Sequence, residues 1–518
     1  MNKKIHFILV DVISKAKCLD VWMCRAIDQV QHIKPLKIMY KLASDIRFWI
    51  VLCFLIRLIL ITNAPLEGSH NWRQTLGTMV TRNFYEIDAN IFYPRIDVPG
   101  DKTGITGMEF PLFNYMGYLL SLLFGYQHWY GRIINLVVSS LGLYMFYRLI
   151  CDHMRDQRLA FYSTMALMFS IWFSYSRKII PDTFSMSLII TSVYFGFQYF
   201  SIKHRNSRLR WVDLALFGIM ATAGLLTKMS SAYFLAILAV PVIQSRRKPW
   251  RVVAFVMTSS LCLFITGLWY MYWVPHLVET YQIHHFYFGT GFANGFRELI
   301  HNIPLLLERF YDTALHDVGF ALSLFGLGWV IIKKDRQVLI ILLLCVPIFF
   351  ATILKLGFNF AHHNYYIIPY VPIMALLAGV GLRRIKPYYL MVALMISMCI
   401  EGFREEQDDL RIEDGNLEIL QLESDLDEFS GRDTLIAVND SGSPTTIYFA
   451  HRKGWSLSNS QILDKAVRRD LEKRGLRLIV VLNNAFGATP VTLNYPRIIE
   501  KDAYTVYRIP RHKKRNHH

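Results

Sequence analysis

Long apolar segments constrain this chain more than any other feature of its sequence. A helix needs about 20 apolar residues to cross the hydrocarbon core of a bilayer, and eleven segments of near that length occur in the first 402 residues. They are 46–62, 131–150, 159–176, 183–202, 211–228, 231–245, 252–274, 313–332, 337–354, 364–382 and 388–402. The chain is 53% hydrophobic and 18% charged. We therefore expect an α-helical polytopic membrane protein.

Basic residues lie in short clusters between these segments. The formal net charge of +17 would suggest a nucleic-acid partner in a soluble protein, but here the clusters occupy every second connection. That is the pattern of cytoplasmic loops under the positive-inside rule. The clusters fall within 148–158, 203–210, 246–251, 333–336 and 383–386. We predict a cytoplasmic N-terminus, an external C-terminus and no nucleic-acid partner.

Three regions flank or interrupt the apolar segments. Residues 1–45 mix apolar and basic positions, which is typical of amphipathic segments on the cytoplasmic leaflet. The outer loop 64–130 contains an apolar stretch, 111–125, that we interpret as a juxtamembrane or re-entrant helix, since counting it as a span would invert every later loop. The membrane domain is then 46–402. Arg57 interrupts its first span, and we expect its side chain to snorkel outward, with phosphate binding as the alternative.

The composition becomes polar at about residue 403, which predicts a small α/β domain at 403–518 on the outer face. Four short runs rich in β-branched and aromatic residues are predicted strands. They are 433–439, 445–449, 476–482 and 503–509. Residues 461–475 are predicted to form a helix with its C-cap at Gly475.

Ionisable and tyrosine side chains gather on the outer side of the predicted membrane domain. Twelve of them are candidate site residues: Glu67, His70, Arg73, Glu109, Arg177, Lys178, Asp182, Lys228, His285, His363, Tyr365 and Tyr366. Carboxylates can act as general bases, and cations can hold a phosphate group. The asymmetry predicts an external site for an anionic ligand next to the bilayer.

The order of several short motifs resembles a known superfamily. The motifs are Glu67-Gly68-Ser69-His70, Glu109-Phe110-Pro111-Leu112, Gly131-Arg132, Asp182 after Ser176-Arg177-Lys178, Gly224-Leu225-Leu226-Thr227-Lys228 and His363-Asn364-Tyr365-Tyr366-Ile367-Ile368-Pro369. Together they resemble the GT-C superfamily of polyprenyl-phosphate-sugar glycosyltransferases, especially protein O-mannosyltransferases and lipid A aminoarabinose transferases. The resemblance covers 46–402. The family usually has Asp where this chain has Glu67.

The resemblance implies a GT-C fold and an inverting transfer of sugar from undecaprenyl phosphate to an envelope acceptor. The acceptor would be lipopolysaccharide, another surface glycan or a protein, and the protein would lie in a bacterial inner membrane with its catalytic face in the periplasm. Glu67 is the predicted base, with Asp182 as the second acid. The other ten candidates would bind the phosphate or the substrate. No cofactor is required, although the resemblance also suggests a divalent metal shared by Glu109 and His285.

Simpler interpretations remain open for several of these residues. Glu67 and Asp182 are each placed to cap a helix N-terminus, Lys228 is placed to snorkel at the interface, and His285 lies in an aromatic run typical of the membrane interface. At the level of the whole protein, the alternatives are a secondary transporter and a non-catalytic factor in envelope-glycan assembly.

Overall fold

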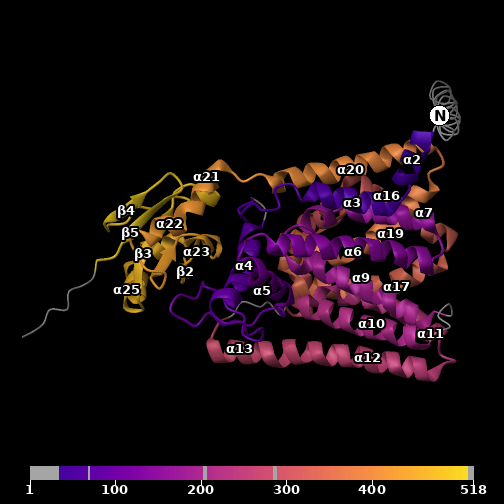
Figure 1. The fold of residues 1–518 in the computed structure, drawn as a ribbon, viewed down its shortest axis with the longest axis horizontal. Helices are drawn as coiled ribbons and strands as arrows, with labels where there is room; N and C mark the ends of the chain where they lie inside the picture. Colours follow the sequence, from indigo (N-terminus) through magenta and orange to yellow (C-terminus); the bar gives the residue numbers. More distant parts are fainter. Residues whose placement is uncertain (1–33, 68–69, 202–206, 284–288, 511–518) are drawn as a thin grey trace, which may run out of the picture.

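The chain folds into a bundle of helices that carries a small β-sheet at one end (Figure 1). The computed structural model describes residues 34–67, 70–201, 207–283 and 289–510. The sheet lies beside α4 (Asn71–Glu86), one of two helices in the predicted outer loop; the other is α5 (Leu112–Phe124).

Six helical stretches in the described part of the chain are long and apolar enough to cross a membrane. Four of them are single helices: α6 (Tyr130–His153), α10 (Ser207–Thr227), α16 (His316–Lys333) and α17 (Arg336–Leu356). Two combine consecutive helical segments: α12 (Pro249–Gly267) with η2 (Leu268–Trp273) and α13 (Val274–Tyr281), and η4 (Asn364–Tyr370) with α19 (Val371–Arg384). The chain is therefore a multi-pass membrane protein, as its composition predicts.

The other five apolar segments form helices that are shorter, broken or more polar. They are α3 (Ile46–Arg57), α7 (Gln157–Met168) with α8 (Trp172–Tyr175), α9 (Pro181–Phe200), η1 (Met229–Leu238) with α11 (Ala239–Gln244), and α20 (Tyr388–Leu410). At 1.5 Å per residue, α9 is about 30 Å long, whereas α3 is about 18 Å long. The number of eleven spans stays a prediction. The α20 helix also continues past residue 403, where the outer domain was predicted to begin.

Five short helices complete the bundle. They are α2 (Lys34–Ala43), α14 (Phe292–His301), α15 (Ile303–Glu308), η3 (Arg309–Ala314) and α18 (Phe358–His362). The α2 helix belongs to the predicted amphipathic N-terminal segment, of which residues 1–33 lie outside the described residues.

Close packing places α9 and α19 inside the bundle. The α9 helix packs between α6 and α10, and α19 packs between α7 and α16. Gly326 of α16 permits the second contact, because a Cβ there would lie 1.9 Å from the backbone oxygen of Leu377 in α19. Small residues at such positions let membrane helices approach closely.

Arg57 points inward, so the expectation that it snorkels outward is wrong. Its side chain is buried, and its guanidinium donates to the backbone oxygens of Cys53 and Phe173, each at 3.2 Å, and to the Ser176 hydroxyl. The backbone oxygen of Phe173 in α8 and the hydroxyl of Ser176, directly after α8, replace water around this charge. Apolar periodicity alone does not reveal such acceptors, because they come from a segment more than 100 residues away.

The sheet has five strands in the order β2-β1-β3-β5-β4. The strands are β1 (Leu435–Val438), β2 (Gly454–Ser456), β3 (Leu476–Leu482), β4 (Arg497–Glu500) and β5 (Tyr504–Arg508). The β2, β1 and β3 strands are parallel, and β5 and β4 continue the sheet in antiparallel pairing. Short helices connect and cover it: α21 (Asp414–Leu417), η5 (Glu418–Gln421), α22 (Leu422–Asp427), α23 (Thr445–Ala450), α24 (Asn459–Leu463), α25 (Lys465–Lys473) and η6 (Ala485–Gly487).

Three of the four predicted strands are present as β1, β3 and β5, but the strand predicted at 445–449 is wrong. That segment is the helix α23, and all six of its side chains are buried. A short run that is buried on every side lacks the alternation that separates a strand from a helix. The predicted helix 461–475 is split at Asp464 into α24 and α25, and Gly475 follows its end with a φ of +108°.

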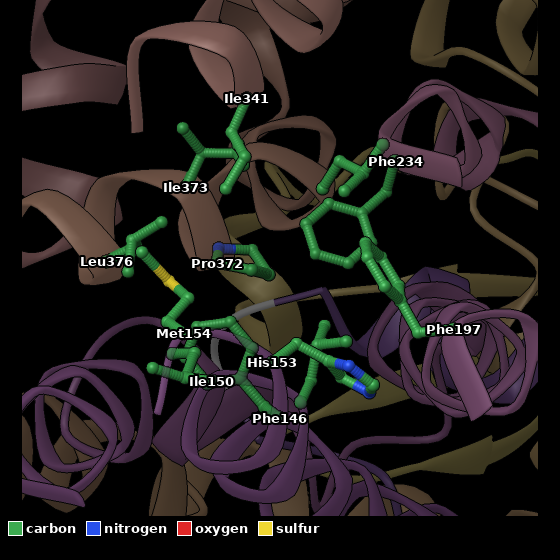
Figure 2. A pocket seen from close by; sticks show the side chains of 12 residues that line it. Phe146, Ile150, His153, Met154, Phe197, Phe234, Ile341, Pro372, Ile373 and Leu376 are labelled. Atoms are coloured by element: carbon green, nitrogen blue, oxygen red, sulfur yellow. The ribbon is translucent and has the colours of Figure 1, made fainter. Parts of the chain in front are cut away.

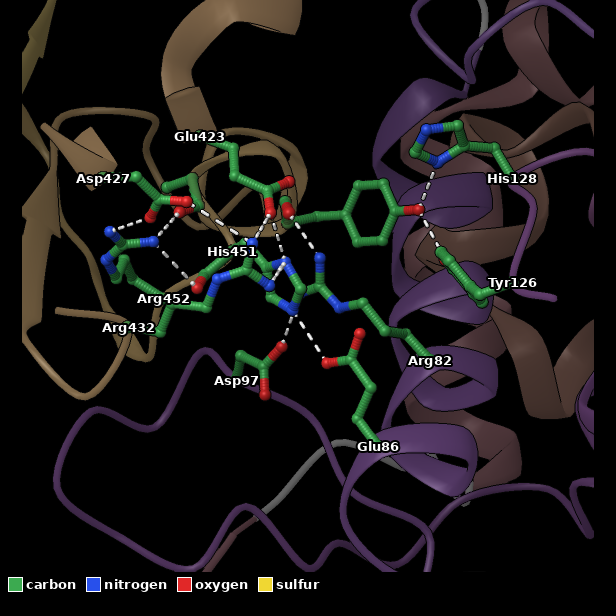
Figure 3. A network of polar contacts seen from close by, with 12 residues as sticks. Arg82, Glu86, Asp97, Tyr126, His128, Glu423, Asp427, Arg432, His451 and Arg452 are labelled. Atoms are coloured by element: carbon green, nitrogen blue, oxygen red, sulfur yellow. Dashed lines mark hydrogen bonds and ion pairs between the residues drawn. The ribbon is translucent and has the colours of Figure 1, made fainter. Parts of the chain in front are cut away.

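The sheet domain docks on α4 through α23 and its neighbours (Figure 3). Arg82 of α4 donates to the backbone oxygen of Tyr448 at 2.9 Å and pairs with Asp97 at 3.0 Å. The Tyr448 hydroxyl lies 2.6 Å from that of Tyr126 and 2.5 Å from Nδ1 of His128. One apolar core continues across this contact, from Leu76 and Val80 of α4 to Ile447 of α23 and strands β1 and β3. The sheet domain and the outer loop therefore form one structural unit.

The contact also contains a histidine between two carboxylates. His451 places Nε2 2.8 Å from Glu86 of α4 and Nδ1 2.8 Å from Glu423 of α22 (Figure 3), and Arg432 also reaches the Nδ1 side. Burial alone would lower the pKa of His451, but its hydrogen bonds to Glu423 and Glu86 raise the pKa above its usual value. The protonated ring therefore stabilises the docked arrangement.

We expect the thermal stability of the protein to decrease as the pH rises from 6 to 9. The stabilisation from His451 is complete below the unfolded pKa of about 6.5 and is lost as the pH passes through the raised folded pKa. Both carboxylates stay ionised over this range. The melting temperature in detergent measures the effect, and the same pH slope in His451→Gln would exclude this histidine as its source.

Candidate active site

A cavity of about 670 Å³ lies where α4 begins, α10 ends and η4 begins. Some of its lining residues are polar or aromatic, and others are apolar. The polar and aromatic lining residues include Trp72, Arg73, Glu109, Lys228, His363, Tyr365 and Tyr366, and the apolar ones include Met271, Phe292, Ile348, Ala351 and Leu356. Six of the twelve predicted site residues thus line one cavity.

A carboxylate between two cations forms the charged centre of this cavity. Oε1 of Glu109 lies 2.9 Å from Nη2 of Arg73 and 3.1 Å from Nζ of Lys228. Arg73 is in the first turn of α4, and Lys228 directly follows α10. The backbone N–H of Phe110 donates to the oxygen of Leu226 at 3.1 Å, which ties the loop carrying Glu109 to the end of α10.

Glu109 is ionised in this arrangement. Burial alone would raise the pKa of its carboxyl group, but the charges of Arg73 and Lys228 hold that pKa well below its usual range. The same cations are therefore partly neutralised. An anionic ligand that reaches the cavity would compete with Glu109 for them.

Asp182 lies behind this centre, in the first turn of α9. It is fully buried, and one of its oxygens lies 3.8 Å from Nζ of Lys228. Among the described residues, neither of its oxygens has a hydrogen-bond partner. Asp182 is thus the second carboxyl group beside the buried Lys228, together with Glu109. Asp182 does not line the cavity.

Aromatic rings form a second wall next to Lys228. Its Nζ lies 5.2 Å from the ring centroid of Tyr366 and 5.6 Å from that of Tyr365. The His363 ring stacks on Tyr365 at 5.5 Å and contacts Trp72 at 5.9 Å. The cationic Nζ of Lys228 therefore lies beside the faces of aromatic rings. A sugar ring can pack on such faces.

His70 lies beneath this wall and is neutral. Its Nδ1 is 3.2 Å from the Tyr175 hydroxyl, which also donates to Asn364, and its ring lies 5.4 Å from that of Tyr365. Burial and the nearby charge of Lys178 lower the pKa of His70 to about 3. The residue can orient Tyr175 and Tyr365 but carries no charge toward a phosphate at neutral pH.

Glu67, the predicted base, is held in a separate buried pair. Its side chain is 6% exposed and lines no part of the cavity described above. Arg132 at the start of α6 forms an ion pair with one carboxylate oxygen, and Nε2 of Gln74 donates to the other at 3.0 Å. Arg132 also donates to the backbone oxygens of Ile61 and Asn63 at 3.2 and 2.6 Å. The pair joins the end of the first span to α4 and α6.

Two further predicted residues, Arg177 and Lys178, do not line the cavity. Arg177 and Lys178 are buried in the turn between α8 and α9, where Nζ of Lys178 lies 4.4 Å from the Tyr175 ring. His285 lies outside the described residues. Within the described ranges, no three His, Cys, Asp or Glu side chains converge on one point as metal ligands would.

A small pocket near the end of α6 has a mostly apolar lining (Figure 2). Its volume is about 50 Å³, and His153 is its one ionisable lining residue. The other lining residues include Phe146, Ile150, Phe234 and Ile373. Among its described lining residues no carboxylate, lysine or arginine is present, so we take the larger cavity as the candidate active site.

Comparison with known proteins places the fold. Residues 106–273 match the family model described as dolichyl-phosphate-mannose-protein mannosyltransferase. The structure is similar to ArnT from Cupriavidus metallidurans, with a TM-score of 0.55 for the apo state and 0.56 for the complex with undecaprenyl phosphate. The chain therefore has the fold of ArnT, which is the GT-C fold that the motif resemblance implies. The identity to the two ArnT structures is 13% and 12%, over 89% of this chain and 97% and 98% of ArnT.

A second GT-C structure agrees with this assignment. The oligosaccharyltransferase of Archaeoglobus fulgidus, in complex with zinc and sulfate, matches with a TM-score of 0.50 and 11% identity. The match covers 84% of this chain and 68% of that protein. No curated protein matches the sequence.

Sequence reasoning missed four contributors to this candidate site. Trp72 lines the cavity, Arg132 pairs with Glu67, and Tyr175 and Asn364 hold His70. The Gly131-Arg132 motif did carry a signal. A Cβ on Gly131 would lie 2.6 Å from Ile179, so the glycine allows α6 to start against the turn before α9, with Arg132 facing inward.

Proposed function

We propose that this protein transfers a sugar from a polyprenyl phosphate, such as undecaprenyl phosphate, to an acceptor in the bacterial cell envelope. The observation that carries the proposal is the Arg73, Glu109 and Lys228 cluster in a cavity that also has apolar lining residues. The GT-C fold and the likeness to ArnT bound to undecaprenyl phosphate support it. The cavity would open to the periplasm, with the N-terminus in the cytoplasm.

The donor is assigned to the cavity by complementarity. Arg73 and Lys228 would hold the lipid phosphate through charge-assisted hydrogen bonds, and the hydroxyls of Tyr365 and Tyr366 would add donors. The apolar lining residues, such as Phe292 and Leu356, suit the first isoprene units of the lipid. Asp182 positions Lys228 from behind and does not touch the donor.

The reaction is a single displacement at the anomeric carbon. The acceptor hydroxyl oxygen forms a bond to that carbon as the bond to the phosphate oxygen breaks, which inverts the configuration. The lipid phosphate leaves with the electron pair of that bond, and the two cations stabilise its charge. The acceptor proton passes to a carboxylate.

We assign this proton transfer to Glu109 in preference to Glu67. Glu109 borders the cavity next to both phosphate-binding cations, whereas both oxygens of Glu67 are engaged by Arg132 and Gln74. A bound donor phosphate would draw Arg73 and Lys228 away from Glu109, which makes that carboxylate a stronger base when the donor is present. Glu67 then acts as a positioning residue through Arg132 and α4.

The residues present do not fit a divalent metal at Glu109. Its Oε1 already contacts two cationic groups at 2.9 and 3.1 Å, and a metal ion there would add a third positive centre. The mechanism accordingly includes no metal step.

Turnover by the purified full-length protein tests the proposal. In detergent, with envelope membranes from cells that lack the protein as acceptor, a panel of undecaprenyl-phosphate sugars should include one that releases undecaprenyl phosphate. A transporter would move a lipid or solute without breaking the sugar–phosphate bond, and an assembly factor would bind glycan without turnover. Either result would contradict the proposal.

We expect Lys228→Gln to weaken donor binding. Loss of a charge-assisted partner to phosphate costs roughly 1.5–3 kcal/mol, which corresponds to about a 10- to 150-fold rise in Kd for undecaprenyl phosphate. Equilibrium binding to protein in nanodiscs measures it. Lys355→Gln is a matched control, because Lys355 lines the same cavity but donates to the backbone oxygen of Thr290 at 3.0 Å. Equal losses in both variants would contradict a specific role for Lys228.

A further inference from the structure

A second cavity of about 420 Å³ lies between the outer loop and the sheet domain. Trp72, Val98 and Lys102 line it from the loop side, and Gly442, Trp455 and Arg474 line it from the sheet domain. Trp72 also lines the cavity that contains Glu109. One indole ring is thus a shared wall of both cavities, and the next residue along the chain is the phosphate-binding Arg73.

The sheet domain presents a binding edge to this cavity. Gly442 lies in the loop that follows the parallel strand β1, and Trp455 lies in the neighbouring parallel strand β2. Ligands of open α/β sheets bind outside the carboxyl ends of such strands. The backbone N–H of Gly442 donates to Ser456 Oγ at 2.6 Å, and a φ of +97° at Gly442 sets the sharp turn. This loop has a defined shape against the cavity.

Close contacts hold the outer loop against the sheet domain beside this cavity. A Cβ on Gly100 would lie 2.1 Å from the Trp455 ring, so the loop backbone packs directly on the indole. Arg474 lies 5.3 Å from the same ring centroid and pairs with Asp101 at 2.5 Å. The N–H of Gly454 donates to the oxygen of Asp97 at 3.0 Å. These contacts fix the cavity walls relative to the reaction centre.

The chemistry of the lining favours an anionic carbohydrate. Lys102 supplies positive charge, Arg474 supplies a guanidinium whose charge is partly offset by Asp101, and none of the described lining residues is acidic. The Nζ of Lys102 donates to the backbone oxygen of Gln282 at 2.8 Å, which leaves two further donors for a ligand. An indole ring with neighbouring cations provides both a stacking face for a sugar ring and a partner for a carboxylate or phosphate substituent.

We propose that this cavity binds the glycan part of the acceptor, that the glycan is anionic, and that the sheet domain selects it. The inference rests on the proposed function. A glycan in the cavity would extend one hydroxyl past Trp72 to the anomeric carbon of the donor. That hydroxyl loses its proton to Glu109, and the donor phosphate leaves from the opposite side. Donor and acceptor thereby enter through different cavities and meet at Trp72.

Kinetic separation of the two substrates tests this assignment. The assay uses the full-length protein in nanodiscs, an undecaprenyl-phosphate sugar that the unaltered protein accepts, and envelope membranes from cells that lack the protein. Val98→Trp fills the second cavity, and Lys102→Gln removes one of its charges. We expect each to raise the KM for the membrane acceptor, by roughly 10-fold or more, while the KM for the donor and the Kd for undecaprenyl phosphate stay unchanged.

Two control variants separate loss of acceptor binding from a structural effect. Lys102→Arg keeps the charge and should restore most of the acceptor KM, which a purely structural effect of Lys102→Gln would not predict. Arg477→Gln removes an exposed charge from β3, outside the cavity, and should leave the KM unchanged. If Val98→Trp does not fold, the Lys102 pair still decides the question. Unchanged acceptor KM in the folded cavity variants would overturn this inference alone, whereas no transfer by the unaltered protein would overturn the proposed function as well.

Discussion

Replacing Glu109 with Gln is expected to reduce turnover by roughly 10²- to 10⁴-fold, the usual contribution of general acid–base catalysis. Gln keeps the size and one oxygen acceptor of the side chain but cannot take the acceptor proton. The same change should leave the affinity for undecaprenyl phosphate unchanged or increase it, because Glu109 no longer competes with the phosphate for Arg73 and Lys228. The measurements are turnover per folded molecule and equilibrium binding of the lipid.

The binding measurement separates this effect from loss of the site. A collapsed cavity would weaken lipid binding together with turnover, as Lys228→Gln is expected to do. Glu279→Gln provides a matched control, since Glu279 is an exposed carboxylate that lies near the end of α13 and does not line the cavity. Turnover of Glu109→Gln near that of the control would exclude Glu109 as the base.

Replacing Arg132 with Met is expected to lower the free energy of unfolding by roughly 3–5 kcal/mol, the range for breaking a buried ion pair. The change leaves the carboxylate of Glu67 buried with Gln74 as its remaining partner among those described, and it removes the donors to the backbone oxygens of Ile61 and Asn63. Unfolding in a mixed detergent, followed by tryptophan fluorescence, measures the loss.

The double variant Arg132→Met with Glu67→Leu tests the cause. Replacing both members of a buried pair with apolar residues is often close to neutral, so it should recover a large part of the lost stability. Full recovery is not expected, because the two backbone oxygens stay without their donor. A double variant as unstable as the sum of the single changes would contradict the assignment of Glu67 as the partner that makes Arg132 essential.

The fold could be predicted where one physical signal dominated. Runs of apolar residues such as 131–150 and 337–354 coincide with α6 and α17, because burial in hydrocarbon requires both length and low polarity. The prediction failed at 445–449, where a short buried helix has the same composition as a strand. Strands β2 and β4 were not predicted, since three- and four-residue edge strands carry too little pattern.

Residue type and topology grouped the candidate site residues but did not show how they pair. The topology and the motif order grouped twelve residues, of which six line one cavity: Arg73, Glu109, Lys228, His363, Tyr365 and Tyr366. They did not indicate which carboxylate faces the cavity. That depends on Arg132, which is 65 positions from Glu67 and, at the start of a predicted span, has the pattern of an interfacial cation. Pairing across such distances is set by packing of α4, α6 and α9, which local sequence does not specify.

The most direct test of the account is the initial rate of undecaprenyl-phosphate release per folded molecule, compared between Glu109→Gln and Glu67→Gln in one preparation. We predict a loss of roughly 10²- to 10⁴-fold for Glu109→Gln. For Glu67→Gln we predict a lower melting temperature and a rate per folded molecule within about 10-fold of the unaltered protein, as expected of a residue that acts through the position of others. The reverse order of the two rates would contradict the assignment of Glu109 and return the role of base to Glu67.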